Sequence, residues 1–163
     1  MTLEFVAMNE KYAKQALALY NAYVLTSTAT FSIAPLSQSE MDHLLFTGLD
    51  RFPSFALIVD GEFAGYVMLN RYKPREAYDQ TAEVTVYLDE YFHGKGFGTK
   101  AMAFIEDFAK EQDFRALLGV ICAENTGSIS LFEKLGYCQC AHFKEVGKKF
   151  DRLLDVVIYE KLI

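Results

Sequence analysis

Three glycines in five positions, Gly94, Gly96 and Gly98, separate a strand-like segment from a helix-like segment. Glycine has no Cβ, so the backbone N–H groups of such a loop can come close to a ligand. The helix that follows adds partial positive charge at its N-terminus, where anions bind. We therefore predict a strand–loop–helix unit, the alternative being a flexible turn without a ligand. The residues expected to hold a cofactor diphosphate are Gly94, Lys95, Gly96, Phe97, Gly98 and Thr99.

The loop does not match the common nucleotide-binding patterns. It lacks the Gly-Lys-Ser/Thr of a P-loop, and its glycines are not spaced as G-x-G-x-x-G. The chain carries 22 Asp and Glu against 16 Lys and Arg, which argues against nucleic acid because phosphate neutralisation needs a basic surface. No apolar run reaches the roughly 18 residues that span a bilayer. The sequence thus predicts a phosphate-bearing cofactor other than ATP or NAD, with no nucleic-acid or membrane partner.

Alternating and helical apolar patterns follow one another along the whole chain, without a repeat or a linker. Asp60-Gly61 is typical of a two-residue hairpin turn, and Gly147 is expected in another turn. The strand-like segments are 3–8, 55–59, 63–72, 81–88, 117–121, 138–146 and 153–162. The helix-like segments are 9–23 with Asn9 as cap, one from Ser37 or Ser39 to about Leu49 with Ser39 and Asp42 as a capping pair, 97–112 and 128–135. We predict one mixed α/β domain over residues 1–163.

A second pattern, N-x-x-x-x-x-L-F-x-x-x-G-Y, runs from Asn125 to Tyr137. Taken alone, its asparagine is typical of a local cap or turn. Together with the glycine loop, the pattern resembles the signature of the GNAT superfamily of acetyl-CoA-dependent N-acetyltransferases. The first motif of that superfamily is Q/R-x-x-G-x-G/A, and here His93 stands in place of Gln or Arg. The resemblance implies the acyl-CoA N-acyltransferase fold, in which helices flank a mostly antiparallel central sheet.

Six further short matches resemble one branch of that superfamily, the phosphinothricin N-acetyltransferases. They are Tyr20-Asn21, Thr26-Ser27-Thr28, Tyr78-Asp79, Thr81-Ala82-Glu83, Thr85-Val86-Tyr87 and Leu135-Gly136-Tyr137. The branch implies acetyl-CoA as co-substrate, no metal and a homodimer. It also implies a small amino-acid-like amine as acceptor, of the phosphinothricin or methionine sulfone and sulfoximine type. Two alternatives stay open, namely acetylation of a protein or peptide and a non-catalytic module that binds acetyl-CoA.

The same resemblance implies how the cofactor is bound. The backbone of Val86, Tyr87 and Leu88 would pair with the pantetheine arm, and an N–H near Tyr87 would polarise the thioester carbonyl. Residues 94–99 would hold the pyrophosphate, and Asn125 would contact the cofactor further along. Most of this site is therefore expected to consist of backbone groups.

Acetyl transfer needs a neutral amine, because an ammonium group has no lone pair and primary amines have pKa values of about 10. Glu83 matches the glutamate to which the resembling branch assigns this proton removal. Strand alternation places it on one face with Thr85 and Tyr87, where burial would raise its pKa toward the working range. The alternative is an ordinary exposed carboxylate on a strand.

Phe132 departs from the resembling enzymes, which carry Tyr or His there as a proton donor. Phenylalanine cannot donate a proton, so the thiol, with a pKa of about 8.5, would leave as thiolate or take its proton elsewhere. Tyr87 and Tyr137 are the candidate donors, and the alternative for both is packing. Arg75, in the loop before the Glu83 strand, is a candidate to pair with a substrate carboxylate, the alternative being simple solvent exposure.

The remaining polar features point to no further chemistry. Three cysteines, Cys122, Cys138 and Cys140, cannot build a disulfide framework. With no N-terminal signal pattern, they predict a cytoplasmic protein. We expect the cysteines to be buried small residues rather than zinc ligands. The charged residues between 144 and 152, with Lys149 and Arg152 among them, are expected to form a solvated hairpin tip.

Overall fold

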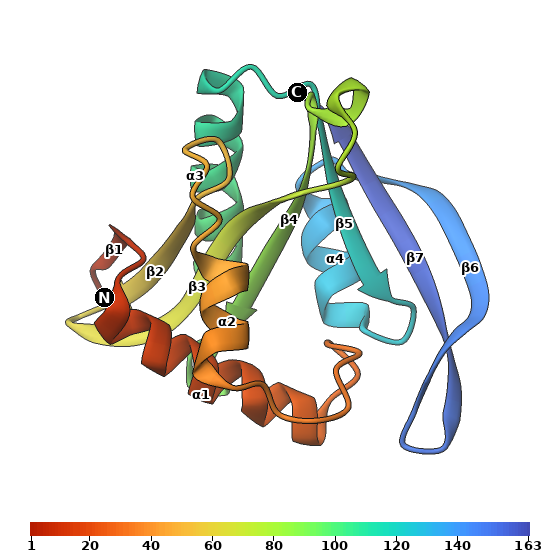
Figure 1. The fold of residues 1–163 in the computed structure, drawn as a ribbon, viewed down its shortest axis with the longest axis horizontal. Coiled ribbons are helices and arrows are strands. Elements are labelled where there is room, and N and C mark those ends of the chain that lie inside the picture. The colour runs from red at the N-terminus through yellow and green to blue at the C-terminus, as the bar shows by residue number, and fades with distance from the viewer.

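A computed structural model describes residues 1–163, which form one seven-stranded sheet with helices on both faces (Figure 1). The strand order is β1-β2-β3-β4-β5-β7-β6, and only the β4–β5 pair is parallel. The strands are β1 (Leu3–Ala7), β2 (Ser54–Val59), β3 (Glu62–Arg71), β4 (Thr81–Leu88), β5 (Ala116–Cys122), β6 (Cys138–Lys149) and β7 (Arg152–Leu162). The predicted mixed α/β fold with a mostly antiparallel sheet is confirmed.

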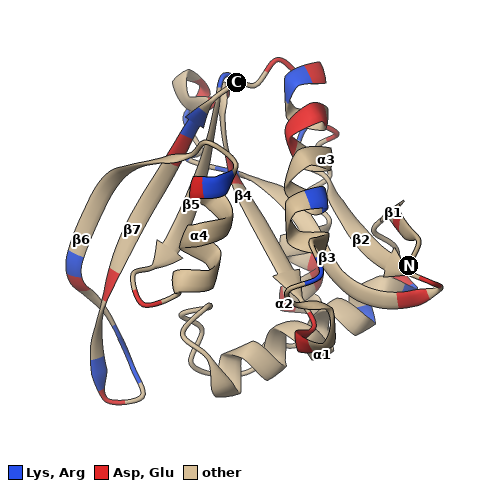
Figure 2. Cartoon of the chain, turned by 180° about the vertical axis from the view of Figure 1, so that it is seen from behind, with Lys and Arg blue, Asp and Glu red and all other residues tan.

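Four α-helices cover the sheet, two on each face. They are α1 (Glu10–Thr26), α2 (Gln38–Leu45), α3 (Phe97–Glu111) and α4 (Thr126–Lys134), and two short 3₁₀ turns, η1 (Glu76–Tyr78) and η2 (Glu90–Phe92), flank β4. The reverse view in Figure 2 brings α3 and α4 in front of the sheet, with α1 and α2 behind it. None of these helices is long and apolar enough to cross a membrane.

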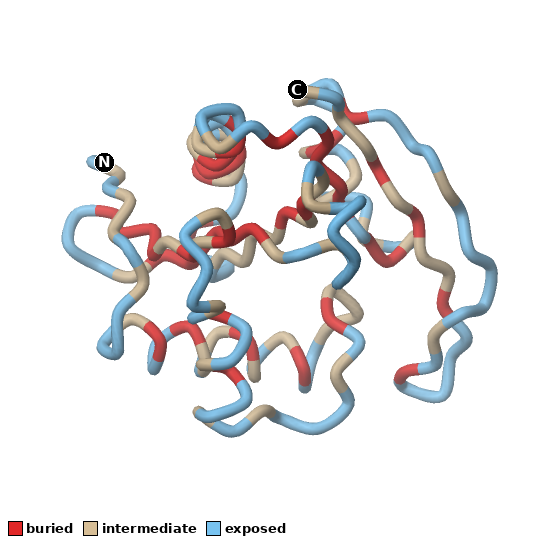
Figure 3. The backbone as a smooth tube through the Cα atoms, turned by 45° about the horizontal axis from the view of Figure 1, so that its top comes forward, coloured by how far each residue is buried: buried red, intermediate tan, exposed pale blue.

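The hydrophobic core has two parts, one on each face of the sheet. The larger cluster packs α3 and Phe132 of α4 against the sheet, with Met102, Ile105 and Leu117 completely buried. The smaller cluster packs α1 and α2 against Tyr66 and Met68 of β3. Figure 3 shows buried backbone along the central strands and an almost continuously exposed β6. The centre of the sheet is therefore the closely packed part of the molecule, from which the loops extend.

Local sequence explains the first helix and the first hairpin. Asn9 Oδ1 accepts a hydrogen bond from Tyr12 N–H at 3.1 Å, so it caps α1 as predicted. Asp60 and Gly61 both have positive φ, 50° and 86°, which is the backbone that a tight β2–β3 turn requires.

The second helix is shorter than predicted, and of its two predicted starts, Ser37 and Ser39, the structure has Ser37 as the cap. It ends at Leu45 and does not reach Leu49. Ser37 Oγ accepts from Glu40 N–H at 3.2 Å, while the Glu40 carboxylate accepts from Ser37 N–H at 2.7 Å. This reciprocal capping box starts the helix, so the Ser39–Asp42 pairing that we expected was wrong.

The prediction that Gly147 lies in a turn was also wrong. Gly147 lies inside β6, and the turn to β7 is made by Phe150 and Asp151, which have φ values of 52° and 56°. A Cβ on Gly147 would lie 2.4 Å from Cε2 of Phe31. Glycine is therefore needed here because an aromatic ring from another segment packs onto the strand.

The parallel β4–β5 pair is unusually short, and this shapes the site. Only Thr81, Ala82 and Glu83 of β4 pair with β5. Beyond Glu83, β4 stays with β3 as far as Leu88, while β5 stays with β7 as far as Cys122. The two strands diverge visibly in Figure 1, which leaves one backbone edge of Val84–Leu88 without a partner strand.

Candidate active site

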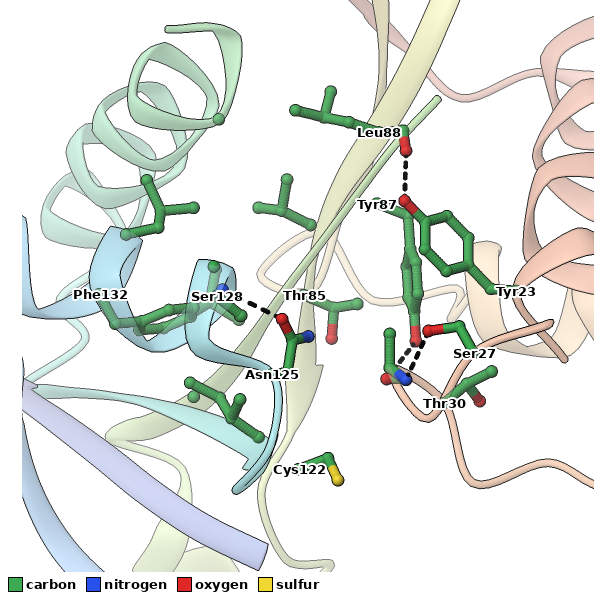
Figure 4. A pocket seen from close by; sticks show the side chains of 18 of the residues that line it. Tyr23, Ser27, Thr30, Thr85, Tyr87, Leu88, Cys122, Asn125, Ser128 and Phe132 are labelled. Carbon is green, nitrogen blue, oxygen red and sulfur yellow. Dashed lines mark hydrogen bonds between the residues drawn. The ribbon is translucent and has the colours of Figure 1, made fainter. Parts of the chain in front are cut away.

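A cavity of about 950 Å³ fills the gap between the diverging strands β4 and β5. Residues of β4, β5, the glycine loop, α4 and the loop after α1 form its walls, and Figure 4 shows the side chains of 18 of the lining residues. Among the predicted site residues, those that line it are Glu83, Val86, Tyr87, Leu88, Gly94, Gly96, Phe97, Gly98, Thr99 and Asn125. Segments far apart in the sequence thus share one cavity.

The glycine loop presents free backbone to this cavity. Gly94 and Gly96 have φ values of 71° and 83°, and Gly96 is the N-cap of α3 without any side-chain cap. A Cβ at either position would meet no atom within 4 Å, so open space lies beside the loop. The uncapped N–H groups at the start of a 15-residue helix fit a diphosphate.

Lys95 and Arg75 do not line the cavity. Lys95 Nζ lies 3.7 Å from the ring centroid of Tyr91, in a cation–π contact. Arg75 is exposed and precedes η1 in the β3–β4 loop. The glycine loop therefore offers backbone groups to the cavity, and both basic side chains lie outside its walls.

The unpaired edge of β4 is held in place from the α1 side. The carbonyl oxygen of Leu88 accepts a hydrogen bond from the Tyr23 hydroxyl at 2.6 Å, and Nε2 of His93 lies 3.0 Å from the same oxygen. Burial, with Glu90 and Asp89 nearby, raises the pKa of Tyr23 to about 12, so its hydroxyl remains a donor. His93 therefore links the glycine loop to the strand before it.

Glu83 stands where β4 and β5 part, since it is the last β4 residue that pairs with β5. Burial raises the pKa of its carboxyl group, as the sequence predicted. No hydrogen bond or ion pair within the chain engages that carboxyl group, although it lines the cavity with Thr85 and Tyr87. A desolvated, unpartnered carboxylate in a cavity is suited to accept a proton.

Tyr87 is packed tightly but keeps its hydroxyl near the cavity. Its ring lies among three other tyrosines, with centroids 5.5 Å from Tyr20, 5.3 Å from Tyr23 and 5.5 Å from Tyr66. Its hydroxyl donates to the carbonyl oxygen of Ala29 at 3.3 Å. Burial raises the pKa of this hydroxyl, so it stays protonated at neutral pH.

Helix α4 supplies the wall opposite Tyr87 (Figure 4). Asn125 Oδ1 accepts from Ser128 N–H at 3.1 Å and caps the helix, while no hydrogen bond within the chain uses the Nδ2 amide. Phe132 lines the cavity and packs on Gly119, where a Cβ would lie 2.3 Å from the ring. Asn125 therefore combines the cap expected from its type with a donor left for a ligand.

Tyr137, one of the candidate proton donors, lies outside the cavity walls. It is 2% exposed, and its ring meets Phe132 edge-on with centroids 4.8 Å apart. Burial and the nearby Glu106 carboxylate raise the pKa of its hydroxyl. Of the two alternatives for Tyr137, packing is the one that its position supports.

The α1–α2 loop, defined here as Ser27–Phe31, forms a wall that the sequence did not predict as part of the site. The only signal was the Thr26-Ser27-Thr28 match. The Thr28 hydroxyl donates to Glu124 Oε1 at 2.7 Å, and Arg152 pairs with both Glu124 oxygens at 2.8 and 2.9 Å. These bonds lower the pKa of Glu124 to about 2, so this lining carboxylate stays ionised and paired.

Two expectations for individual residues were wrong. Lys149 does not belong to a solvated tip, because it is 4% exposed and reaches under the α1–α2 loop. Cys138 and Cys140 are exposed on β6, and only Cys122 is buried. Strand β6 is at the edge of the sheet and no helix packs on it. The alternation of its side chains therefore does not bury Cys138 or Cys140.

Comparison with known proteins agrees with this geometry. The family model described as Acetyltransferase (GNAT) family matches residues 16–137. Phosphinothricin N-acetyltransferase of Streptomyces viridochromogenes is 30% identical over 88% of this chain and 78% of its own length.

Two solved structures superpose along the whole chain. A Sinorhizobium meliloti phosphinothricin acetyltransferase in complex with acetyl-CoA gives a TM-score of 0.92 at 25% identity, covering 100% of this chain and 89% of that one. A Brucella melitensis ribosomal-protein-alanine N-acetyltransferase gives 0.92 at 26% identity, covering 100% of both.

Proposed function

Since the chain belongs to the GNAT family of acetyltransferases, it is an acetyl-CoA-dependent N-acetyltransferase, and we propose that its acceptor is the primary amine of a small amino-acid-like substrate. The proposed acceptors are of the phosphinothricin or methionine sulfone and sulfoximine type, and the first of these is the activity named for the Streptomyces relative. The observation that carries the proposal is the shared cavity, in which Glu83, the free edge of β4 and the glycine loop face one space.

Acetyl-CoA supplies an activated acetyl group as a thioester. The uncapped N–H groups of Gly96–Thr99 bind its diphosphate, and the free backbone edge of Val86–Leu88 pairs with the extended pantetheine arm. An N–H of that edge, near Tyr87, would be the donor to the thioester oxygen and would stabilise negative charge there. The Nδ2 amide of Asn125 donates to the same extended arm from the opposite wall.

Glu83 takes the proton from the acceptor ammonium, directly or through one water molecule. Its raised pKa brings it closer to that of the amine, which improves a general base at neutral pH. The rate should therefore fall as pH drops through this raised pKa, at a higher pH than for an ordinary glutamate. A pH profile of kcat/KM, compared with that of Glu83→Gln, measures this directly.

The leaving thiolate receives no proton from Phe132, and Tyr137 is walled off behind it. Because a thiol has a pKa of about 8.5, the thiolate is a stable enough leaving group at neutral pH. Of the two candidate donors only Tyr87 lines the cavity, and its proton is engaged by the carbonyl oxygen of Ala29. We propose release as thiolate, with protonation by solvent.

One experiment tests the acceptor class. The purified protein is incubated with acetyl-CoA and a panel of amino acids, simple amines and peptides, while thiol release is followed. Acetylation of carboxylate-bearing small amines supports the proposal. A reaction confined to peptides favours the second candidate, a protein N-acetyltransferase, for which the Brucella structure is the supporting observation.

Absence of any thiol release above the rate of hydrolysis supports the third reading, a module that binds acetyl-CoA without catalysis. We also propose that the enzyme is a cytoplasmic homodimer, as in the resembling branch. Light scattering of the purified protein tests its oligomeric state.

A further inference from the structure

Lys149 is a buried cation without a carboxylate partner. Its side chain leaves β6 and places Nζ 2.7 Å from the carbonyl oxygen of Ser27 and 2.8 Å from that of Thr30. No ion pair involves Lys149, and burial lowers the pKa of its ammonium group. Desolvating an ammonium is costly unless hydrogen bonds offset the loss. The bonds that offset it here go entirely to the backbone of the α1–α2 loop.

Two independent contacts join the same two segments. The ring of Phe31 packs onto Gly147 of β6, at a distance that no other residue type permits. Arg152 of β7 holds Glu124, which in turn accepts from the Thr28 hydroxyl. The β6–β7 hairpin therefore meets the loop directly at Ser27, Thr30 and Phe31, and reaches Thr28 through Glu124, although the segments are 122 positions apart at the Ser27–Lys149 bond.

The loop held in this way is a wall of the reaction cavity, and it lies on the acceptor side. It follows α1, which covers the sheet face opposite to α3 and α4 (Figures 1 and 2). The diphosphate site is the N-terminus of α3, on that other face. Glu83, Thr85 and Tyr87 project toward the α1 face, and the Tyr87 hydroxyl donates to Ala29 of the loop. The acceptor amine must reach Glu83 from this side.

We propose that Lys149 is a positioning residue for the acceptor: it fixes Ser27–Phe31 as a preformed wall, and so sets the affinity for the amine but not for acetyl-CoA. This inference rests on the proposed function, because it requires an acceptor bound beside the loop. Ordering a loop before the ligand arrives removes an entropic cost from binding. Without Lys149 the carbonyls of Ser27 and Thr30 lose their donor, the loop keeps only its remaining contacts, such as Tyr20–Thr30 and Thr28–Glu124, and part of its ordering falls to the acceptor.

The test replaces Lys149 by methionine, which keeps the length of the side chain and removes its donors. The matched control is Lys148→Met, an exposed neighbour on the same strand. In Lys149→Met we expect the KM of the acceptor to rise roughly tenfold, as for the loss of a charged hydrogen bond. We expect kcat to stay within about threefold and the Kd of CoA to stay unchanged. Amide hydrogen exchange should accelerate in residues 27–31 and not in residues 94–99.

Three outcomes overturn the inference. They are an unchanged acceptor KM, an equal loss of acceptor and CoA binding, and hydrogen exchange in residues 27–31 identical to that of the parent. Lys149→Gln, which keeps an uncharged NH2 donor group on a shorter side chain, should give an intermediate KM and serves as second variant if the methionine protein does not fold. If neither folds, Lys149 holds the fold as a whole and the inference fails. Exchange needs no acceptor, so it tests the tether even if no amine is acetylated and the proposed function fails.

Discussion

The cofactor side of the cavity is built from backbone within short contiguous segments, whereas the acceptor side depends on side chains and a loop brought together over more than a hundred residues. Gly94–Thr99 and Val86–Leu88 offer N–H and C=O groups whose positions follow from the local fold. Ser27–Phe31 is held by Tyr20 close by and also by Lys149, Arg152 and Gly147, which lie far away in the chain. We therefore expect the binding of acetyl-CoA to depend on few particular side chains, and the choice of acceptor to depend on many.

The sharpest test of this contrast is Glu83→Gln, because it changes an acceptor-side side chain and leaves the backbone edge intact. General base catalysis is worth about 10²–10⁴-fold, so kcat/KM for the amine should fall by that range. The Kd of CoA, measured by calorimetry, should not change. A variant within about twofold of the parent in rate, well short of that range, removes Glu83 from the mechanism.

The opposite test is Gly96→Val, which attacks the cofactor side. A β-branched residue at φ 83° is strained, and its side chain would occupy the open space beside the helix start. We expect CoA affinity to fall by about tenfold or more, because the added side chain blocks the approach of the diphosphate to the backbone N–H groups; the strain itself, roughly 1–3 kcal/mol, lowers stability.

Gly61→Val is the matched control for this variant. Gly61 has a φ of 86° and no atom near its Cβ position, but it lies in the β2–β3 turn away from the cavity. It should lose stability in a thermal melt and keep its CoA affinity. If Gly96→Val binds CoA as tightly as the parent, the glycine loop does not hold the diphosphate.

A smaller effect is expected from Arg75→Ala. Arg75 is exposed and outside the cavity wall, so it would reach a substrate carboxylate only at the rim. The KM of an amino-acid acceptor should rise at most about tenfold, as for a partly exposed charged hydrogen bond. The matching amine without a carboxylate should be unaffected, and Lys73→Ala in the same loop is the control. No change for either acceptor means that the carboxylate is bound elsewhere.

The smallest effect concerns stability and distinguishes Glu83 from an exposed carboxylate. The folded-state pKa of Glu83 lies above the unfolded value of about 4.3, so the folded protein binds more protons between these two values. Stability from this group is present below the unfolded pKa and is lost as pH rises through the folded pKa. In thermal melts, Glu83→Gln should gain Tm relative to the parent across that window and keep the gain above it. Parallel pH curves for the two proteins contradict burial of this carboxylate.

The sequence predicted the cofactor side of the cavity better than the acceptor side. The glycine loop was predicted from its own residues, because a loop and a helix start form from neighbouring positions, whereas the roles of Asn125 and of the strand edge came from the family resemblance; all three line the cavity. Lys149 was misjudged as solvated, since nothing in a run of charged residues reveals that one of them meets two carbonyls from residues 27 and 30. Tyr137 was a candidate donor on residue type alone, and its burial behind Phe132 depends on how α4 packs.

The gap between β4 and β5 also bears on how the protein avoids aggregation. Unpaired strand edges recruit foreign strands, and this sheet has three of them. The edge at β1 is only five residues long, and the edge at β6 is broken by two irregularities and carries lysines. The third edge, Val84–Leu88, lies inside the cavity between β4 and β5. A single extended chain fits into such a gap, whereas a strand that belongs to another sheet does not. The gap that is proposed to hold the pantetheine arm therefore also shields this strand edge from strands of neighbouring molecules.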